Sequence, residues 1–322
     1  MKKVAIMSVL QAILQAEHNI RPYIRETPLE HSHPLSQLTG GQVFLKLETL
    51  QYTGSFKVRG AMNALLSLTS EQRKKGVVTA SSGNHGIAVA FGLHALGAQG
   101  TIFMNESTSS TKVEAIRSYG ASIRFWGTDS VMAEEHARSY AAQSDMVYIS
   151  PYNDPHVIGG QGTIAIELCR QIEHIDVVLA ALGGGGMISG IATYLKSIFP
   201  RAQVIGCSPG NSPVMAKSVQ AGRILELESL PTLSDGTAGG VEQDAITFPL
   251  CQQFVDDYIL VSEEEIRQSM RQCIQKHHIL IEGSAAVPLA AVMKTPERFR
   301  DKTVIVVLCG ANVSLETLKA IL

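Results

Sequence analysis

The stretch VVLAALGGGGMISG, residues 177–190, decides the fold class of this chain. Its first six residues form a continuous apolar run, which is typical of a β-strand buried on both faces. Four consecutive glycines follow, and the pattern from Met187 onward is helical. A buried strand, a glycine turn and a helix are the start of a strand–helix–strand unit in a parallel sheet.

The same alternation of apolar runs and helical patterns recurs along the chain. Gly97 and Gly120 stand where a left-handed residue can end two of the expected helices. The predicted strands are residues 77–81, 101–104, 123–126, 177–182, 204–207 and 304–308, and the predicted helices are residues 84–96, one through 119, 131–142 and one from the glycines to about 199. The sequence therefore predicts an α/β protein with open parallel sheets.

The chain length and the grouping of these units predict two domains. At about 150 residues per domain, 322 residues correspond to roughly two. The strand–helix units between about residues 75 and 148 suffice for one compact sheet, and the segments before and after them would form a second. We expect a large domain of residues 1–52 and 149–322, with a small domain of residues 53–148 inserted into it.

Composition excludes several classes of protein. Apolar residues make up 45% and charged residues 17%, so the chain can bury a core and is not disordered. Its 27 Lys and Arg residues nearly balance its 29 Asp and Glu residues, for a net charge of −2. We therefore expect no nucleic-acid partner and no binding to an anionic membrane surface.

Neither the N-terminus nor the cysteines point to export. The segment MKKVAIMSVLQAIL (1–14) is broken by Gln11, and its apolar spacing favours an amphipathic helix ending before Pro22 over a signal peptide. No stretch has the roughly 20 apolar residues of a membrane span. The cysteines are scattered, without a CxxC pair: Cys169, Cys207, Cys251, Cys273 and Cys309. We expect a cytoplasmic protein without a disulfide framework or zinc site.

The glycine run Gly183-Gly184-Gly185-Gly186 is the first of three loops that could carry chemistry. Consecutive backbone N–H groups and the start of a helix favour binding of an anion such as phosphate over a simple tight turn. Gly184, Gly186 and Gly190 also fit a dinucleotide pattern. Cys207 and Ser208 stand where the acidic residue for a ribose would be expected, which counts against a dinucleotide.

The second loop is Ser81-Ser82-Gly83-Asn84-His85-Gly86, which follows a predicted strand. Its hydroxyls, amide and N–H groups at a helix start could bind a carboxylate, or could simply cap the helix. The third element is Ser55–Gly60, with Lys57 near a helix start. The helix dipole and burial would lower the pKa of such an amine and make it a nucleophile, unless the side chain is merely exposed.

Together these loops and their order resemble the fold-type II family of pyridoxal-phosphate enzymes, in the threonine/serine dehydratase and serine racemase group. The matching segments are SFKVRGAMNAL (55–65), SSGNHG (81–86), GQGTIA (160–165), GGGGMISG (183–190) and CGANVS (309–314), with weaker matches in PTLSDGTAGG (231–240), ILVSEEEI (259–266) and IEGSAA (281–286). The resemblance implies a fold like that of the tryptophan synthase β-subunit, with the cofactor between two open parallel-sheet domains. It also implies a homodimer.

The resemblance assigns roles to individual residues. Lys57 would hold pyridoxal 5′-phosphate as a Schiff base and serve as catalytic base, with Phe56 packed beside it. Asn84 would bind the 3′-oxygen of the ring, and Gly183 to Gly186 with Met187 would bind the phosphate. The substrate carboxylate would be received by Ser81, Ser82, Asn84 and His85; Cys309 would face the pyridine nitrogen, and Glu282 would lie near the cofactor.

The implied reaction is removal of water from L-threonine, L-serine or a related 3-hydroxy amino acid, which gives a 2-oxo acid and ammonia. His85 favours the dehydratase and racemase branch over the cysteine synthases, and Ser82 keeps racemisation open because racemases place a serine there. Similarity to dehydratases of hydroxyectoine utilisation leaves the substrate open. Cys207-Ser208-Pro209 lacks the glutamate that starts the racemases' metal site, so we expect no such metal.

Overall fold

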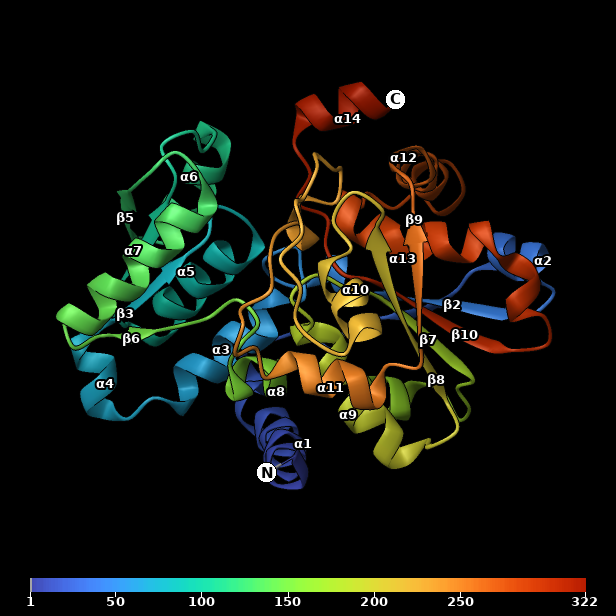
Figure 1. Ribbon diagram of the computed structural model, residues 1–322, viewed down its shortest axis with the longest axis horizontal. Helices are drawn as coiled ribbons and strands as arrows, with labels where there is room; N and C mark the ends of the chain where they lie inside the picture. Colours follow the sequence, from blue (N-terminus) through green and yellow to red (C-terminus); the bar gives the residue numbers. More distant parts are fainter. Residues whose placement is uncertain (1) are drawn as a thin grey trace.

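A six-stranded sheet forms the larger part of the molecule, in the order β1-β2-β10-β7-β8-β9 (Figure 1). The computed structural model describes residues 2–322, with side chains described for residues 9–110 and 112–322. The strands are β1 (Leu29–His31), β2 (Gln42–Leu47), β7 (Val177–Ala181), β8 (Gln203–Pro209), β9 (Asp257–Val261) and β10 (Thr303–Leu308). β1 runs antiparallel to β2, and the other neighbours are parallel.

A four-stranded parallel sheet in the order β5-β4-β3-β6 forms the smaller part. Its strands are β3 (Val77–Ala80), β4 (Gly100–Met104), β5 (Ser122–Phe125) and β6 (Val147–Tyr148), and its helices are α4 (Ser70–Lys75), α5 (Asn84–Leu96), α6 (Ser110–Arg117) and α7 (Ser130–Gln143). Within β4, Phe103 packs on α7, whereas Ile102 and Met104 pack on α5 and α6. Because side chains alternate along a strand, both faces of this sheet are covered by helices.

The remaining helices surround the large sheet and fill the space between the two sheets (Figure 1). They are α1 (Lys2–Ile20), α2 (His33–Thr39), α3 (Lys57–Ser67), α8 (Pro155–Gln171), α9 (Gly186–Ile198), α10 (Val214–Ala221), α11 (Thr247–Phe254), α12 (Glu263–Gln272), α13 (Gly283–Lys294) and α14 (Leu315–Ile321), with 3-10 turns η1 (Arg21–Tyr23), η2 (Glu48–Leu50), η3 (Asp235–Thr237) and η5 (Pro296–Phe299) and the π-helical turn η4 (Cys273–His277).

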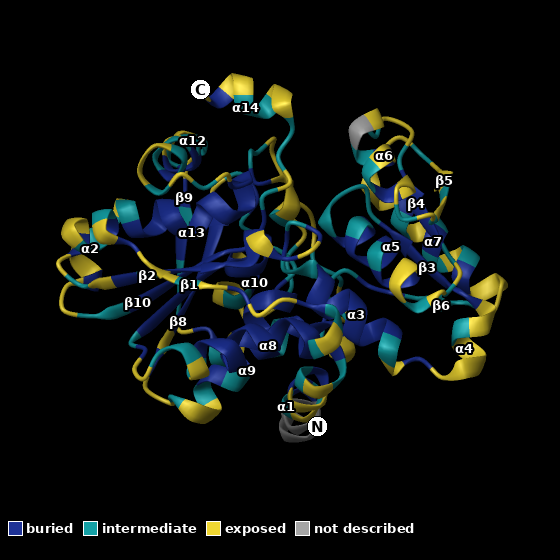
Figure 2. Cartoon of the chain, turned by 180° about the vertical axis from the view of Figure 1, so that it is seen from behind, coloured by how far each residue is buried: buried dark blue, intermediate teal, exposed yellow. Residues whose placement is uncertain are grey.

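Helix α8 is buried along almost its whole length and packs against α1, α3 and α9 (Figure 2). Its glycines permit this close packing. A Cβ on Gly160 would lie 2.6 Å from Gly60 Cα, and one on Gly162 would lie 2.7 Å from Ile13 Cδ1. The glycines of the segment GQGTIA therefore let the backbone of α3 and the Ile13 side chain of α1 pack directly on α8.

The predicted α/β class and the open parallel sheets are confirmed. Gly97 ends α5 at φ 59°, as predicted, whereas α6 ends at Arg117 and reaches the left-handed Gly120 through a turn. Strands β1, β2, β6 and β9 were not among the predicted strands. All strands of the small sheet fall within residues 53–148 and those of the large sheet fall outside, but the domain boundaries themselves stay a prediction.

Two further observations concern the whole described chain. Across residues 2–322, none of the helices has both the length and the apolar character needed to cross a membrane. Each of the five cysteines is a free thiol.

Candidate active site

The three loops singled out in the sequence meet at the carboxyl ends of strands from both sheets. Ser81 and Ser82 follow β3, the glycine run follows β7, and Cys309 follows β10. Open α/β sheets bind their ligands at this edge. The backbone of the lysine segment is fastened there, since Phe56 N–H donates to Cys309 O at 3.0 Å and Ser55 forms a bridge with Gly310.

Lys57 is the first residue of α3, as the sequence predicted. Its side chain is partly buried, and its Nζ donates to the carbonyl oxygen of Pro151 at 2.8 Å. The Phe56 ring lies beside it, with 5.4 Å between Nζ and the ring centroid. Loss of solvation lowers the pKa of the Lys57 amine to about 8, although Cys309 and Glu282 act in the opposite direction. The amine therefore has a neutral, nucleophilic form near physiological pH.

The glycine run packs against Tyr152, which follows Pro151 in the chain. A Cβ on Gly184 would lie 2.6 Å from Tyr152 Cγ, and one on Gly183 would lie 2.8 Å from Thr237 Cα. Gly185 has φ 87°, in the left-handed region, and is the N-cap of α9. Met187 is buried in the first turn of that helix. The four glycines thus form a cradle in which side chains have no room and the backbone N–H groups can face an anion.

Asn84, Glu282 and Asn312 connect the two sheets across the site. Asn84 Nδ2 donates to both carboxylate oxygens of Glu282, at 2.8 and 3.0 Å. Asn312 Nδ2 donates to Asn84 Oδ1 at 2.6 Å, and Asn312 N–H donates to Glu282 Oε2 at 3.1 Å. Burial raises the pKa of Glu282 to about 7, partly opposed by the hydrogen bond from Asn84. Glu282 can therefore hold or release a proton near neutral pH.

His85 is buried at the start of α5, and its Nε2 lies 3.2 Å from Ile149 O. Burial and the charge of Lys57 lower its pKa to about 3, so the imidazole is neutral. A carbonyl can only accept, which places the proton on Nε2 and leaves Nδ1 as an acceptor. The backbone N–H of His85 lies in the first turn of α5, which follows the loop of Ser81 and Ser82.

Cys309 is buried at the end of β10, and burial raises the pKa of its thiol well above the ordinary value. The residue is therefore a neutral group in the site. Within the part of the chain that the structure describes, no cluster of His, Cys, Asp and Glu side chains could hold a metal ion.

Phe56, next to Lys57, thus binds the backbone of Cys309, and Asn84 binds Glu282. Gly310 joins these two groups, since the N–H of Glu282 donates to its carbonyl oxygen at 3.0 Å. The glycine run reaches Lys57 through Pro151 and Tyr152. Sequence reasoning missed Asn312 and Tyr152 as site residues. Asn312 belongs to the segment CGANVS, so its motif could have revealed it. Tyr152 lies in a loop after β6 that contains no recognisable motif. Only its packing against Gly184 shows that it belongs to the site.

Comparison with known proteins decides the family. The family model described as "Pyridoxal-phosphate dependent enzyme" matches residues 20–310. The chain belongs to this family. Its cofactor is pyridoxal 5′-phosphate, which decides against the dinucleotide alternative.

Similar proteins and structures are ammonia-lyases and racemases. An L-threonine ammonia-lyase of Thermotoga maritima is 37% identical over 98% of this chain and 78% of that protein. The solved structure of a processed threonine deaminase isoform 2 from Solanum lycopersicum has TM-score 0.94 and 32% identity, over 98% of this chain and 92% of that one. That of maize serine racemase has TM-score 0.91 and 33% identity, over 96% and 95%.

The residues present fit the cofactor. The cradle at Gly183 to Gly186 suits a phosphate, because any Cβ at Gly183 or Gly184 would meet Thr237 or Tyr152. The amine of Lys57, with its lowered pKa, suits an aldehyde. Both lie beside the consecutive residues Pro151 and Tyr152, so one ligand can engage them together.

Proposed function

We propose that this protein is an ammonia-lyase that removes water from L-threonine, L-serine or a related 3-hydroxy amino acid and forms a 2-oxo acid and ammonia. The observation that carries this proposal is the partly buried Lys57 amine, with a pKa of about 8, beside the glycine cradle. It is supported by the L-threonine ammonia-lyase of Thermotoga maritima, with 37% identity over nearly the whole chain.

Pyridoxal phosphate, when bound, would supply an aldehyde for Lys57 and an electron sink for the substrate carbanion. In our proposal the free amine of Lys57 would remove the α-proton of the substrate. Phe56 would pack beside the cofactor, Asn84 would bind its 3′-oxygen, and Gly183 to Gly186 with Met187 would hold its phosphate. Cys309 would face its ring nitrogen, with Glu282 nearby. The substrate carboxylate would be bound by Ser81, Ser82, Asn84 and His85.

The neutral Cys309 thiol supports elimination. A carboxylate beside the ring nitrogen would favour its full protonation and strengthen the electron sink, whereas a thiol with a raised pKa does not. A weaker sink favours rapid loss of the 3-hydroxyl over a long-lived carbanion. The α-proton and the hydroxyl leave as water, which leaves an enamine. The enamine tautomerises to an imine, and hydrolysis of that imine releases ammonia and the 2-oxo acid.

Racemisation of serine is a second candidate, favoured by one residue. Ser82 lies in the loop between β3 and α5, where it could donate a proton from the side opposite to Lys57. Maize serine racemase is among the similar structures. Under this alternative Ser82→Ala abolishes formation of D-serine and spares elimination from the L-substrate.

The deciding experiment measures 2-oxo acid and the chirality of the remaining amino acid in the same reaction, with threonine, serine and 3-hydroxyaspartate as substrates. We expect 2-oxo acid and ammonia in equal amounts, and no product with Lys57→Ala. Rapid formation of D-serine with little pyruvate would reverse the order of the two candidates. A purified protein without the visible absorbance of a Schiff base would contradict both.

We also propose that the protein is a homodimer located in the cytoplasm. The dimer is suggested by the family resemblance, and the location by the five free thiols. Analytical ultracentrifugation of the holoenzyme tests the first, with a mass of one chain as the contrary result.

A further inference from the structure

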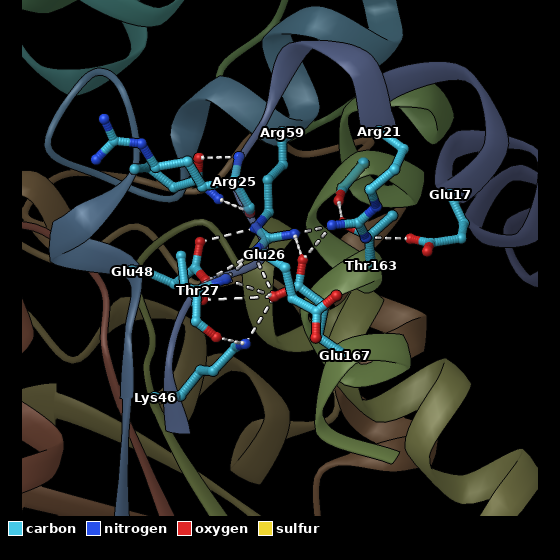
Figure 3. A network of polar contacts seen from close by, with 12 residues as sticks. Glu17, Arg21, Arg25, Glu26, Thr27, Lys46, Glu48, Arg59, Thr163 and Glu167 are labelled. Carbon is cyan, nitrogen blue, oxygen red and sulfur yellow. Dashed lines mark hydrogen bonds and ion pairs between the residues drawn. The ribbon is translucent and has the colours of Figure 1, made fainter. Parts of the chain in front are cut away.

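A cluster of buried charges surrounds Arg59 (Figure 3). Arg59, on the first turn of α3, binds two carboxylates in a forked arrangement. Its Nε and Nη2 donate to Glu48 at 2.7 and 2.8 Å, and its Nη1 and Nη2 donate to Glu167 at 2.7 and 2.8 Å. All three side chains are fully buried.

Further contacts complete the cluster and connect it to several elements. Lys46 Nζ, also fully buried, donates to Glu167 Oε2 at 2.6 Å and to Thr27 O at 2.7 Å. Arg21, which is 29% exposed, donates to Glu167 Oε1 at 2.8 Å from outside the core. Glu48 follows β2 and Glu167 lies on α8, so Arg59 fastens α3 to the large sheet and to its buried helix at once.

Arg59 and Glu167 keep their charges over the physiological pH range. The two carboxylates raise the pKa of Arg59, and Arg59 and Lys46 lower the pKa of Glu167 to about 2. Two cations face two anions in the core, with no net charge among Arg59, Lys46, Glu48 and Glu167.

Stability alone does not explain such a cluster. Buried ion pairs replaced by apolar residues of similar volume often leave a protein as stable or more stable, because the charges no longer have to lose their hydration. The Arg59 guanidinium makes four nitrogen–oxygen contacts, and its planar shape then prevents it from rotating. These contacts therefore fix the position of the residue. The backbone contact of Gly60 with Gly160 restricts the same turn of α3.

We propose that Arg59 is a positioning residue for Lys57. The two residues share the first turn of α3. Lys57 Nζ donates to Pro151 O at 2.8 Å, and from this position it must reach the cofactor aldehyde. By fixing that turn on Glu48 and Glu167, Arg59 sets the distance between the amine and the glycine cradle. This inference rests on the proposed function only in that Lys57 forms a Schiff base with the cofactor.

The first test compares Arg59→Lys with Arg21→Gln in the holoenzyme. Arg59→Lys keeps the charge and loses the fork, whereas Arg21→Gln removes another cation from the same Glu167 without touching α3. We expect Arg59→Lys to lower kcat by about 10- to 100-fold with KM nearly unchanged, as a misplaced reacting group does. The pH midpoint of the visible absorbance of the Schiff base should shift as well, and Arg21→Gln should change neither quantity.

The second test separates position from stability. In the combined variant Lys46→Met, Glu48→Leu, Arg59→Met and Glu167→Leu, the buried charges are absent together. We expect this variant to melt near the wild-type temperature in its cofactor-free form, yet to show the shifted midpoint and lowered kcat. It therefore decides the matter if Arg59→Lys fails to fold.

Three results would overturn the inference. The first is that Arg59→Lys or the combined variant folds and has the same kcat and the same pH midpoint of the Schiff-base absorbance as the wild type. Another is an Arg21→Gln effect as large as that of Arg59→Lys. The third is failure of both Arg59→Lys and the combined variant to fold, which would assign the cluster to stability. Failure of the proposed function looks different, because the wild-type protein itself would then release no ammonia from 3-hydroxy amino acids.

Discussion

Replacing Lys57 by methionine in the cofactor-free protein should stabilise the fold at pH 7 and lose most of that gain at pH 10. Burial lowers the pKa of the Lys57 amine from 10.5 to about 8. At 1.36 kcal/mol for each tenfold change, the charged amine destabilises the folded state by about 3 kcal/mol. This cost is fully present below pH 8 and disappears above pH 10.5, where the amine is neutral in both states.

The lost hydrogen bond to Pro151 O acts at both pH values and subtracts about 1 kcal/mol from the gain. The difference between the two pH values is therefore the informative quantity, at about 2 kcal/mol. Urea unfolding of the cofactor-free wild type and variant at pH 7 and pH 10 measures it, because each comparison is made at a single pH. Lys217→Met is the matched control, since Lys217 is an exposed lysine on α10.

A stability change that is the same at both pH values would refute the reasoning. It would mean that the Lys57 amine keeps its hydration in the folded state. The lysine would then be an ordinary exposed side chain on the first turn of α3, and its reactivity toward an aldehyde would need another explanation.

Three further variants test other parts of the site. Gly184→Ala places a methyl group 2.6 Å from Tyr152 Cγ, so it should destabilise the folded protein by about 1–3 kcal/mol and weaken binding of pyridoxal phosphate in a fluorescence titration. Gly240→Ala is the control and should do neither, because no atom lies within 4 Å of its added methyl group. Glu282 has a pKa raised to about 7, so its charge lowers the free energy of unfolding above pH 7 and has no effect below pH 4.5. In urea unfolding, Glu282→Gln should therefore increase the free energy of unfolding by about 2 kcal/mol more at pH 9 than at pH 5. An equal increase at both pH values would contradict the assignment. Asn312→Ala removes the hydrogen bond to Asn84 Oδ1 and should shift the visible absorbance of the holoenzyme. Asn211→Ala removes a hydrogen bond to Pro231 O outside the site and should leave the spectrum unchanged.

The sequence predicted most closely the strands whose patterns are largely apolar. β7 and β10 are continuous runs of Val, Leu, Ile and Ala, and the expected strands coincide with them to within a residue. β2, in contrast, carries Lys46 in a fully buried position, which breaks the apolar run. The partner that makes this burial tolerable, Glu167, is 121 residues away, and no local pattern reveals such a pair.

The candidate site shows the same division. The lysine, asparagine and glycine segments are local motifs, so resemblance could assign them roles. The contacts of Tyr152 with Gly184 and of Asn312 with Asn84 join segments that are far apart in the chain. Their detection requires the fold, because only the register of the two sheets brings these loops to one edge.

Contacts with both sheets hold Lys57 and Asn84 in the site. Lys57 falls within the segment 53–148 by sequence, but Arg59 binds its helix to Glu48 and Glu167 beside the large sheet. The same helix, α3, packs on α5 of the small sheet in one apolar cluster. Asn84 follows β3 of the small sheet, and its amide binds Glu282, which directly precedes α13 on the large sheet. A displacement of the small sheet alone would therefore break buried contacts of both residues.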